Sequence, residues 1–259
     1  MSSVPLAGMA AHLDALLRIR DISDYPPALN GVQVEHRGPV VRIAAAVDTS
    51  ARTIRGAVDA GANLLLVHHG LFWGGLQTLT GPHYSRVRLL LDHDVALYSA
   101  HLPLDAHATF GNSLLLAREI GLAASAGFAR HETIDCGVRG TGDIATTELL
   151  TRLNVFARTH GGSAIASAIA DGRRTRHWAI CSGAGANADT IREAVELGVD
   201  TLITGEGPHW SAVDADEQGL VIIYAGHYAT ETLGVCALAA DLGATFGLPW
   251  SFIAAPTGL

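Results

Sequence analysis

Long uncharged apolar runs are missing from this chain of 259 residues. No window of about 18 residues is both apolar and free of charge, which argues against a membrane-spanning helix. The N-terminal segment also lacks the basic residues that open an export signal, and Asp14 and Arg18 interrupt its apolar stretch. We therefore expect a cytoplasmic protein with no membrane partner.

Paired cysteines and an excess of positive charge are also missing. Cys136, Cys181 and Cys236 lie far apart and form no C-x-x-C pair, so they predict neither a zinc ribbon nor a disulfide framework. A net charge of −8 argues against a basic groove for nucleic acid. With 49% hydrophobic and 16% charged residues, the composition is that of an ordered globular protein, long enough for one large domain or two modest ones.

Strand-like and helix-like segments alternate along the first half of the chain. Residues 40–47 and 64–67 are short and apolar, as expected of strands buried on both faces, and residues 95–99 form a third such segment. Helical spacing covers residues 51–60 and 111–120, each followed by a glycine that can end a helix. Strands separated by helices predict βαβ units and a mostly parallel sheet in an α/β fold.

The sequence also repeats itself. Residues 53–70 align without a gap on residues 190–207, and eight of these 18 positions are identical. A second pair shares a histidine and a carboxylate four residues apart: His101 with Asp105, and His227 with Glu231. Chance similarity between helix–strand segments would explain the apolar matches, but it explains the shared Thr-Ile-Arg and the histidine–carboxylate units less well. We interpret the repeat as two related α/β halves joined near residues 123–127.

Candidate metal ligands stand at the predicted strand ends, where ligands bind in parallel α/β sheets. His68 and His69 are adjacent, and because successive strand side chains point to opposite sides, the two imidazoles can serve two different metal ions. His101, Asp105, His227 and Glu231 add imidazoles and carboxylates at two more strand ends. Taken singly, Asp105 could simply cap the start of the next helix. Glu231 could simply lie in the first turn of a helix, where the helix dipole favours a negative side chain. Together, the three units predict one metal site.

Two further features follow strands of the second half. The repeat places Glu206 where His69 stands in the first half, so Glu206 is a candidate proton carrier or substrate contact, with a surface glutamate as the alternative. The segment 182–185, Ser-Gly-Ala-Gly, could offer backbone amides to an anion. Because Ala188 stands where a dinucleotide fingerprint needs its third glycine, a tight structural turn is the better interpretation.

Five ordered motifs then resemble a known family over essentially the whole chain: L-N-G-V-Q-V (29–34), V-H-H-G (67–70), H-L-P-L-D-A-H (101–107), T-G-E (204–206) and G-H-Y-A-T-E (226–231). The chain is similar to the dinuclear-metal-centre hexameric proteins, whose bacterial members are labelled GTP cyclohydrolase I type 2 homologues. The resemblance implies that the metal ligands are His68, His69, Asp105, His227 and Glu231, with Glu231 bridging. It implies that His101 is a weaker ligand or a residue that orients a ligand.

The resemblance also implies an architecture. We expect two related α/β domains with mostly parallel sheets, the second inserted into the first. Residues 1–124 and 222–259 would form the metal-site domain and residues 125–221 the insert, in the short form of the family, which assembles as a homohexamer. The histidine pair of the family is usually followed by proline, and the glycine found here, Gly70, is expected to relax the loop that follows.

Two divalent ions, whether zinc, manganese or iron, would suit hydrolysis of a phosphoester or addition of water to a ring carbon. We therefore expect a dinuclear-metal-dependent hydrolase, similar to a GTP cyclohydrolase, that acts on a nucleotide or related small molecule. The alternative is a non-catalytic scaffold that binds, regulates or delivers metal. Coordination positions left open to water favour the hydrolase, whereas a saturated ligand set favours the alternative.

Overall fold

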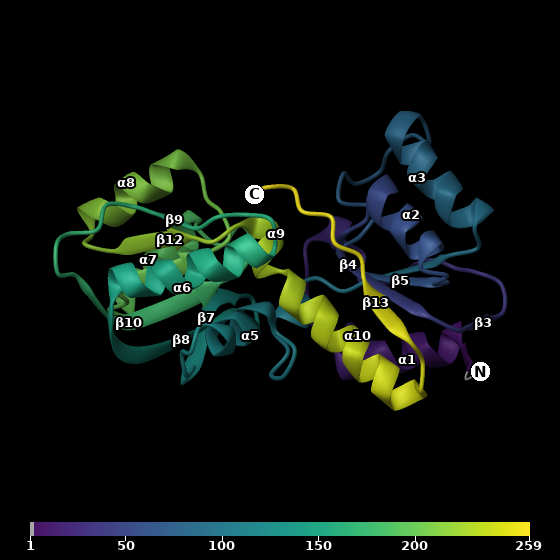
Figure 1. Cartoon of the computed structure of the whole chain (residues 1–259), viewed down its shortest axis with the longest axis horizontal. Coiled ribbons are helices and arrows are strands. Elements are labelled where there is room, and N and C mark those ends of the chain that lie inside the picture. Colours follow the sequence, from purple (N-terminus) through teal and green to yellow (C-terminus); the bar gives the residue numbers. More distant parts are fainter. Residues whose placement is uncertain (1–2) are drawn as a thin grey trace. The chain divides into compact units, whose positions relative to one another are not determined.

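The computed structural model describes residues 3–259, and the chain divides into two compact units (Figure 1). Unit 1 comprises Met1–His107 and Gly234–Ala255, and unit 2 comprises Ala108–Leu233 and Pro256–Leu259. The first unit is therefore interrupted by the second, which confirms the expected insertion of one α/β domain into another. Within residues 3–259, no helix combines the length and the apolar character needed to cross a bilayer.

Unit 1 is built on a five-stranded sheet in the order β13-β4-β5-β6-β2. Its strands are β2 (Gly31–Val34), β4 (Ile43–Asp48), β5 (Leu64–His69), β6 (Ala96–Ser99) and β13 (Trp250–Phe252). Only β2 runs antiparallel to its neighbour, so the sheet is mostly parallel, as predicted. Helices α2 (Ala51–Asp59) and α3 (Gly81–Asp92) cover one face, and α1 (Leu6–Leu16) and α10 (Thr232–Phe246) lie on the other (Figure 1).

Shorter elements complete unit 1. A two-stranded ribbon pairs β1 (Val4–Pro5) with β3 (Pro39–Val40), η1 (Pro26–Ala28) precedes β2, and α4 (Leu102–Asp105) follows β6. Alternate residues of β4 and β5, among them Ala46 and Val67, pack with Ile54 of α2 and Leu90 of α3 in one buried cluster. Both faces of the central strands are thus covered, which explains their nearly continuous apolar sequences.

Unit 2 is built on a six-stranded sheet in the order β7-β8-β10-β11-β12-β9. Its strands are β7 (Ala126–His131), β8 (Ile134–Ala145), β9 (Ile165–Ala166), β10 (Arg174–Cys181), β11 (Thr201–Thr204) and β12 (Val221–Tyr224). The inner strands β10, β11 and β12 are parallel, whereas β7, β8 and β9 run antiparallel to their neighbours. The parallel part is thus the one that resembles unit 1.

Helices cover both faces of the second sheet as well. They are α5 (Asn112–Glu119), α6 (Thr146–Thr159), α7 (Ala188–Glu196), α8 (His209–Glu217) and the single turn α9 (His227–Thr230). Trp178 and Ile180 of β10 share a core with α5 and α6, and Ala179 between them shares a core with α7 and α8. The alternation along one strand therefore separates two cores on opposite faces.

The internal repeat corresponds to equivalent helix–strand units, α2–β5 and α7–β11. Thr53 and Thr190 stand at the same position of the two helix starts, where the backbone N–H of Thr53 donates to the side chain of Ser50 and that of Thr190 to the side chain of Asn187. The next repeated residue, Ile54 in α2, is buried like its counterpart in α7. The identical positions thus serve helix capping and core packing in both units.

The chain passes from one compact unit to the other at residues that differ from the predicted domain boundaries. Helix α5 was expected in the first domain, but Leu116 and Ala117 pack against Trp178 in unit 2. The turn α9 also belongs to unit 2, because Ala229 shares that core. The limits at residues 124 and 222 stay predictions, while the compact units place the change near residues 107 and 233.

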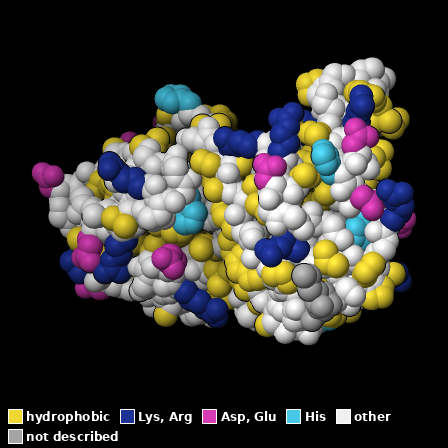
Figure 2. All heavy atoms as spheres, turned by 45° about the vertical axis from the view of Figure 1, so that its right-hand side comes forward, with side chains coloured by type: hydrophobic (Ala, Val, Ile, Leu, Met, Phe, Trp, Pro, Cys, Tyr) yellow, Lys and Arg dark blue, Asp and Glu magenta, His cyan; other side chains and the backbone are white. Residues whose placement is uncertain are grey.

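Charged side chains of both signs are spread over the face shown in Figure 2. Basic groups lie among acidic and uncharged ones there, in keeping with the net charge of −8.

Candidate metal centre

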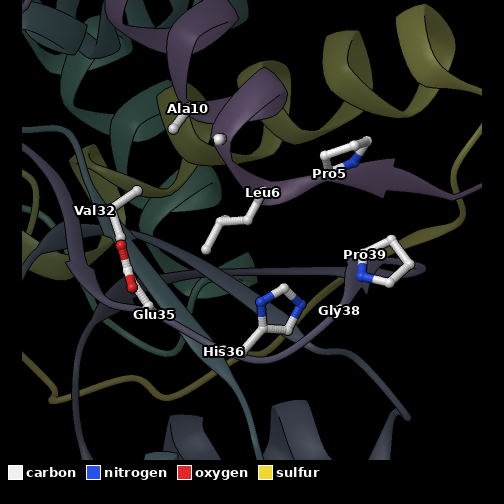
Figure 3. Close-up of a pocket in the computed structure, with 9 residues that line it drawn as sticks. Pro5, Leu6, Ala10, Val32, Glu35, His36, Gly38 and Pro39 are labelled. Atoms are coloured by element: carbon white, nitrogen blue, oxygen red, sulfur yellow. The ribbon is translucent and has the colours of Figure 1, made fainter.

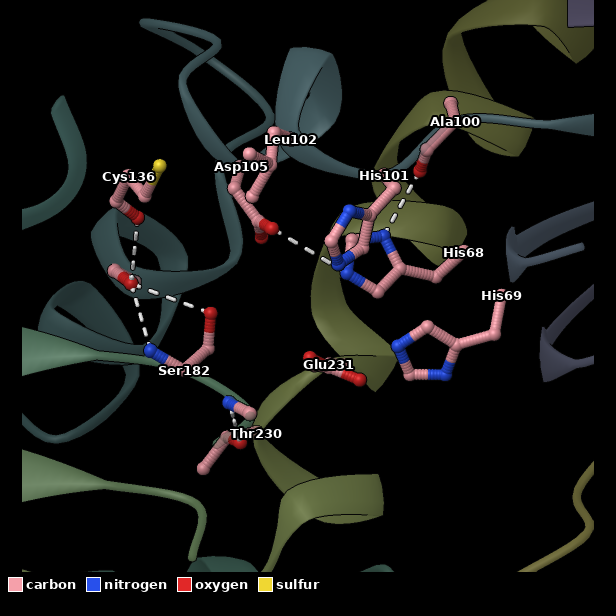
Figure 4. Close-up of polar contacts among 12 residues, drawn as sticks. His68, His69, Ala100, His101, Leu102, Asp105, Cys136, Ser182, Thr230 and Glu231 are labelled. Atoms are coloured by element: carbon pink, nitrogen blue, oxygen red, sulfur yellow. Dashed lines mark hydrogen bonds and ion pairs between the residues drawn. The ribbon is translucent and has the colours of Figure 1, made fainter. Parts of the chain in front are cut away.

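Three histidines converge at one edge of the sheet in unit 1. His68 and His69 are the last residues of β5, and His101 follows β6, the parallel neighbour of β5 (Figure 4). Each offers one ring nitrogen to a group in which these nitrogens all lie within 4.8 Å of one another. His68 is fully buried and His101 nearly so. Because parallel strands end at a common edge, two neighbouring strand ends bring three imidazoles together, and this group could hold a metal ion.

The opposite nitrogen of each ring is fixed by an acceptor. Nδ1 of His68 donates to the carbonyl oxygen of Ala100 at 2.8 Å. Nδ1 of His69 donates to Asp48 at 2.8 Å, and Nδ1 of His101 donates to Asp24 at 2.9 Å. Carbonyl and carboxylate oxygens only accept, so the proton resides on Nδ1 and Nε2 keeps its lone pair. Histidines that bind metal are held in this way in proteins.

Asp105 lies beside this group of three histidines. Its carboxylate is 3.4 Å from Nε2 of His68, and its side chain is 7% exposed (Figure 4). The sequence left open that Asp105 caps the following helix, but it closes the short helix α4, and Gly111 precedes α5 instead. The structure therefore places a carboxylate beside an imidazole of the neighbouring strand end.

Unit 2 holds a histidine–carboxylate group of its own at the end of β12. Gly226, with a positive φ of 92°, turns the chain into α9, which begins at His227. Nε2 of His227 lies 3.1 Å from Glu231, and its Nδ1 donates to Glu206 at 2.8 Å. Burial lowers the pKa of His227, but the two carboxylates outweigh that effect and raise the pKa to about 9. A positive charge is thus favoured on His227, whose side chain is partly exposed, beside the nearly buried Glu231.

Glu206 orients a histidine in this arrangement. The sequence offered it as a proton carrier or substrate contact, or as a plain surface residue. Its carboxylate accepts from Nδ1 of His227, just as Asp48 accepts from His69 in unit 1. The repeat aligned Glu206 with His69 itself, so equivalent positions of the two halves serve different purposes.

The turn at residues 182–185 forms a wall beside Glu231. Gly183 has a positive φ of 64°, and a Cβ there would overlap Oε1 of Glu231 and lie 3.4 Å from Nε2 of His227. The Gly183 N–H donates to Thr230 at 3.0 Å, and its carbonyl accepts from the N–H of Glu206 at 2.9 Å. The amide of Gly183 is therefore engaged inside the protein, and this glycine allows close approach to the carboxylate.

Sequence reasoning missed the residues that support the histidines. Asp48 could have been found, because it ends β4 in register with His69. Asp24 gave no signal, since it lies in an irregular loop far from the histidines in sequence. Asn30, in the first family motif, accepts from the backbone N–H of His101 at 2.7 Å and donates to Asp24 at 2.8 Å.

The relaxed loop expected after Gly70 stays a prediction, and the structure shows which side chain lies against this glycine. The side-chain amide of Gln33 lies where a Cβ on Gly70 would stand. Oε1 of Gln33 accepts from the N–H of Leu71 at 2.7 Å, and Nε2 of Gln33 donates to two backbone carbonyls. A Cβ at this position would therefore displace the end of the Gln33 side chain, which anchors the loop through its bond to Leu71.

A surface pocket of about 590 Å³ elsewhere in unit 1 lacks this ligand pattern (Figure 3). Apart from Glu35 and His36, the residues lining it are apolar or glycine. Nε2 of His36 already accepts from Asn63 at 3.0 Å, because the oxygen of that amide is bonded to backbone N–H groups. One imidazole and one exposed carboxylate do not make a metal site there.

Comparisons with known proteins agree with the resemblance carried by the motifs. A model of the Duf34/NIF3 family (NGG1p interacting factor 3) matches residues 6–257. A protein of Deinococcus radiodurans described as a GTP cyclohydrolase 1 type 2 homolog is 42% identical, covering 92% of this chain and 89% of the relative. One of Halobacterium salinarum with the same description is also 42% identical, covering 94% and 95%.

Two solved structures match over the whole of both chains. The structure titled protein ybgI, unknown function, has a TM-score of 0.89 and 31% identity. TTHA1606 from Thermus thermophilus has a TM-score of 0.84 and 37% identity. Both comparisons cover 100% of each chain.

Proposed function

Because the chain belongs to the Duf34/NIF3 family, we propose that it is a metal-dependent hydrolase acting on a nucleotide or a related small molecule. The proposal includes two divalent ions per chain, zinc, manganese or iron. Their ligands are His68, His69 and Asp105 of unit 1 and His227 and Glu231 of unit 2. The relatives described as GTP cyclohydrolase 1 type 2 homologues support the substrate class.

The observation that carries the proposal is that four imidazoles are held by a hydrogen bond at the same ring nitrogen. His68, His69, His101 and His227 each donate Nδ1 to a carbonyl or carboxylate. Such bonding fixes the ring orientation and holds a proton on Nδ1, so that Nε2 is the nitrogen that binds metal, after loss of its own proton in the case of His227. Histidines that only fill a core have no reason to be bonded at Nδ1 in all four cases.

The donor set fits a divalent metal of borderline softness. Imidazole nitrogens with carboxylates suit zinc, manganese or iron, and no cysteine is among the proposed ligands. Divalent ions held by these residues would activate water and polarise the group under attack. Asp48 and Glu206 would keep His69 and His227 aimed at the ions, while the raised pKa of His227 indicates that positive charge is favoured beside Glu231.

Metal analysis combined with a hydrolysis screen tests this proposal. Protein loaded with zinc, manganese or iron and then desalted is expected to hold about two ions per chain. His68→Ala and Glu231→Ala are expected to hold fewer, whereas His93→Ala, which removes an exposed histidine of unit 1, should match the wild type. Fewer than one ion per wild-type chain would refute the metal centre.

The catalytic part of the proposal has its own outcome. The loaded protein is screened against nucleoside triphosphates and phosphodiesters for release of phosphate or formate. We expect turnover that requires metal and is lost in His68→Ala. Full metal loading without turnover would refute the hydrolase and favour a non-catalytic metal-binding scaffold.

The quaternary structure is part of the same proposal. The family resemblance suggests a homohexamer, and light scattering coupled to size-exclusion chromatography gives its mass directly. A monomer at micromolar concentration would refute it without bearing on metal content.

A further inference from the structure

Asp24 joins an irregular loop to the histidine group of unit 1. It lies shortly before η1, and its side chain is only 6% exposed. Oδ1 accepts from the N–H of Tyr25 at 2.7 Å and from Nδ1 of His101 at 2.9 Å. Oδ2 accepts from Asn30 at 2.8 Å and from the N–H of Leu102 at 2.9 Å. Both oxygens of this carboxylate are therefore fully engaged.

These partners leave the negative charge of Asp24 without a permanent counter-ion. In the described part of the chain they are backbone N–H groups, an amide and an imidazole, and none is an arginine or lysine. A nearly buried carboxylate is costly unless a positive charge compensates it. A cation bound at Nε2 of His101 would lie across the imidazole ring from Asp24 and would compensate its negative charge.

The other two histidines of the group are held differently. His68 donates to a neutral carbonyl oxygen, and His69 donates to Asp48, whose side chain is 36% exposed. Solvent screens a charge at that exposure far more than at Asp24. His101 is thus the histidine of this group whose acceptor at Nδ1 is both charged and removed from water.

We propose that Asp24 is a positioning residue of the metal centre and acts through His101. It fixes the ring orientation and the Nδ1–H tautomer, and its charge makes Nε2 of His101 a stronger donor to a divalent cation. His101 is accordingly a metal-binding residue that contributes substantially to the affinity of the site. The inference rests on the metal binding in the proposed function and is independent of hydrolysis.

A double-mutant cycle tests whether Asp24 acts through His101. Zinc affinity is measured by competition with a chromophoric chelator for the wild type, Asp24→Asn, His101→Ala and the double variant. Asp24→Asn keeps the side-chain shape and removes the charge, and we expect it to weaken zinc binding by about 10–100-fold. In the His101→Ala background the same change is expected to cost less than about 3-fold, because the residue through which it acts is gone.

The visible spectrum of the cobalt-loaded protein reports the ligands directly. We expect Asp24→Asn and His101→Ala to alter the spectrum in the same direction, since both weaken one imidazole ligand. An equal loss of zinc affinity from Asp24→Asn in both backgrounds would overturn the inference, as would an unchanged cobalt spectrum. Zinc binding that survives His68→Ala unchanged would instead refute the metal centre itself.

Asn30→Ala controls for a loop that is merely loosened. Asn30 bonds both Asp24 and the backbone of His101, so its removal slackens the same loop but leaves the carboxylate on the imidazole. Melting temperatures of the metal-free variants show how much each one loosens. If Asn30→Ala weakens zinc binding as much as Asp24→Asn does, tethering explains the effect and the inference fails.

Discussion

The close approach of Gly183 to Glu231 makes a substitution at this glycine unusually informative. Gly183→Ala adds a single methyl group where φ is +64°, directly against Oε1 of Glu231 and 3.2 Å from its Cδ. Two costs arise: an alanine in the left-handed region, and displacement of a carboxylate proposed to bind metal. A variant that carries only the first cost can separate them.

Gly198→Ala is that variant. Gly198 lies in the same unit with a φ of +68°, and nothing stands within 4 Å of the Cβ it would gain. The left-handed conformation costs an alanine about 1–2 kcal/mol, which corresponds to a fall of about 2–8 °C in melting temperature for a protein of this size. We expect Gly198→Ala to show this fall when metal-free, and Gly183→Ala to show at least as large a fall, because the displaced Glu231 also contacts His227.

Zinc affinity then distinguishes the two glycines. Gly183→Ala is expected to bind zinc about 10–100-fold more weakly than the wild type, because the Glu231 carboxylate must move. Gly198→Ala should bind within about 3-fold of the wild type, an effect below about 1 kcal/mol. Equal affinities for the two variants, measured by chelator competition, would show that the turn does not hold Glu231 in place and would refute the reasoning.

Three further predictions concern pH, the loop after the histidine pair, and metal. The pKa of His227 is raised to about 9 in the folded, metal-free chain, so its ion pair contributes stability below pH ~6.5 and loses it as the pH rises towards 9; the stability difference between wild type and Glu231→Gln should shrink over that range in urea titrations. Gly70→Ala should destabilise the wild type by about 1–3 kcal/mol but cost less in a Gln33→Ala background, and equal costs in both would contradict the contact. Zinc at about 100 times its Kd should stabilise the wild type by about 2.7 kcal/mol, and chelation should reverse the rise in melting temperature; an undiminished rise in His68→Ala would place the ion elsewhere.

The central strands and the histidine ends could be predicted because their cause is local or repeats in the sequence. The run before His68 is apolar because β5 is buried on both faces, and the next parallel strand brings His101 to the same edge. In the shared Thr-Ile-Arg motif, the threonine takes part in helix capping and the isoleucine packs in the core of both helices. These features need only strand period, helix caps and the rule that parallel strands end together.

The supports of the site escaped prediction because they depend on tertiary structure. Asp24 reaches His101 only once the loop before η1 has folded over the strand end, and no periodic pattern marks that path. The antiparallel strands at the edges of the second sheet, β7, β8 and β9, were not predicted for a similar reason. Gly137 of β8 is needed where a Cβ would overlap the backbone of Ile180, a contact that exists only after β8 and β10 pair.

The pairing of β13 with β4 has a consequence for how the protein is made. Residues 250–252 complete the sheet of unit 1, and Trp250 lies beside Ile43, near the other end of the chain. During synthesis the edge of β4 stays open until these residues leave the ribosome, and an open edge invites pairing with other chains. All strands of unit 2 lie between residues 126 and 224, so this unit can close first. The sheet of unit 1 is therefore the later of the two sheets to be completed, and nascent chains stalled before β13 are the ones expected to need a chaperone.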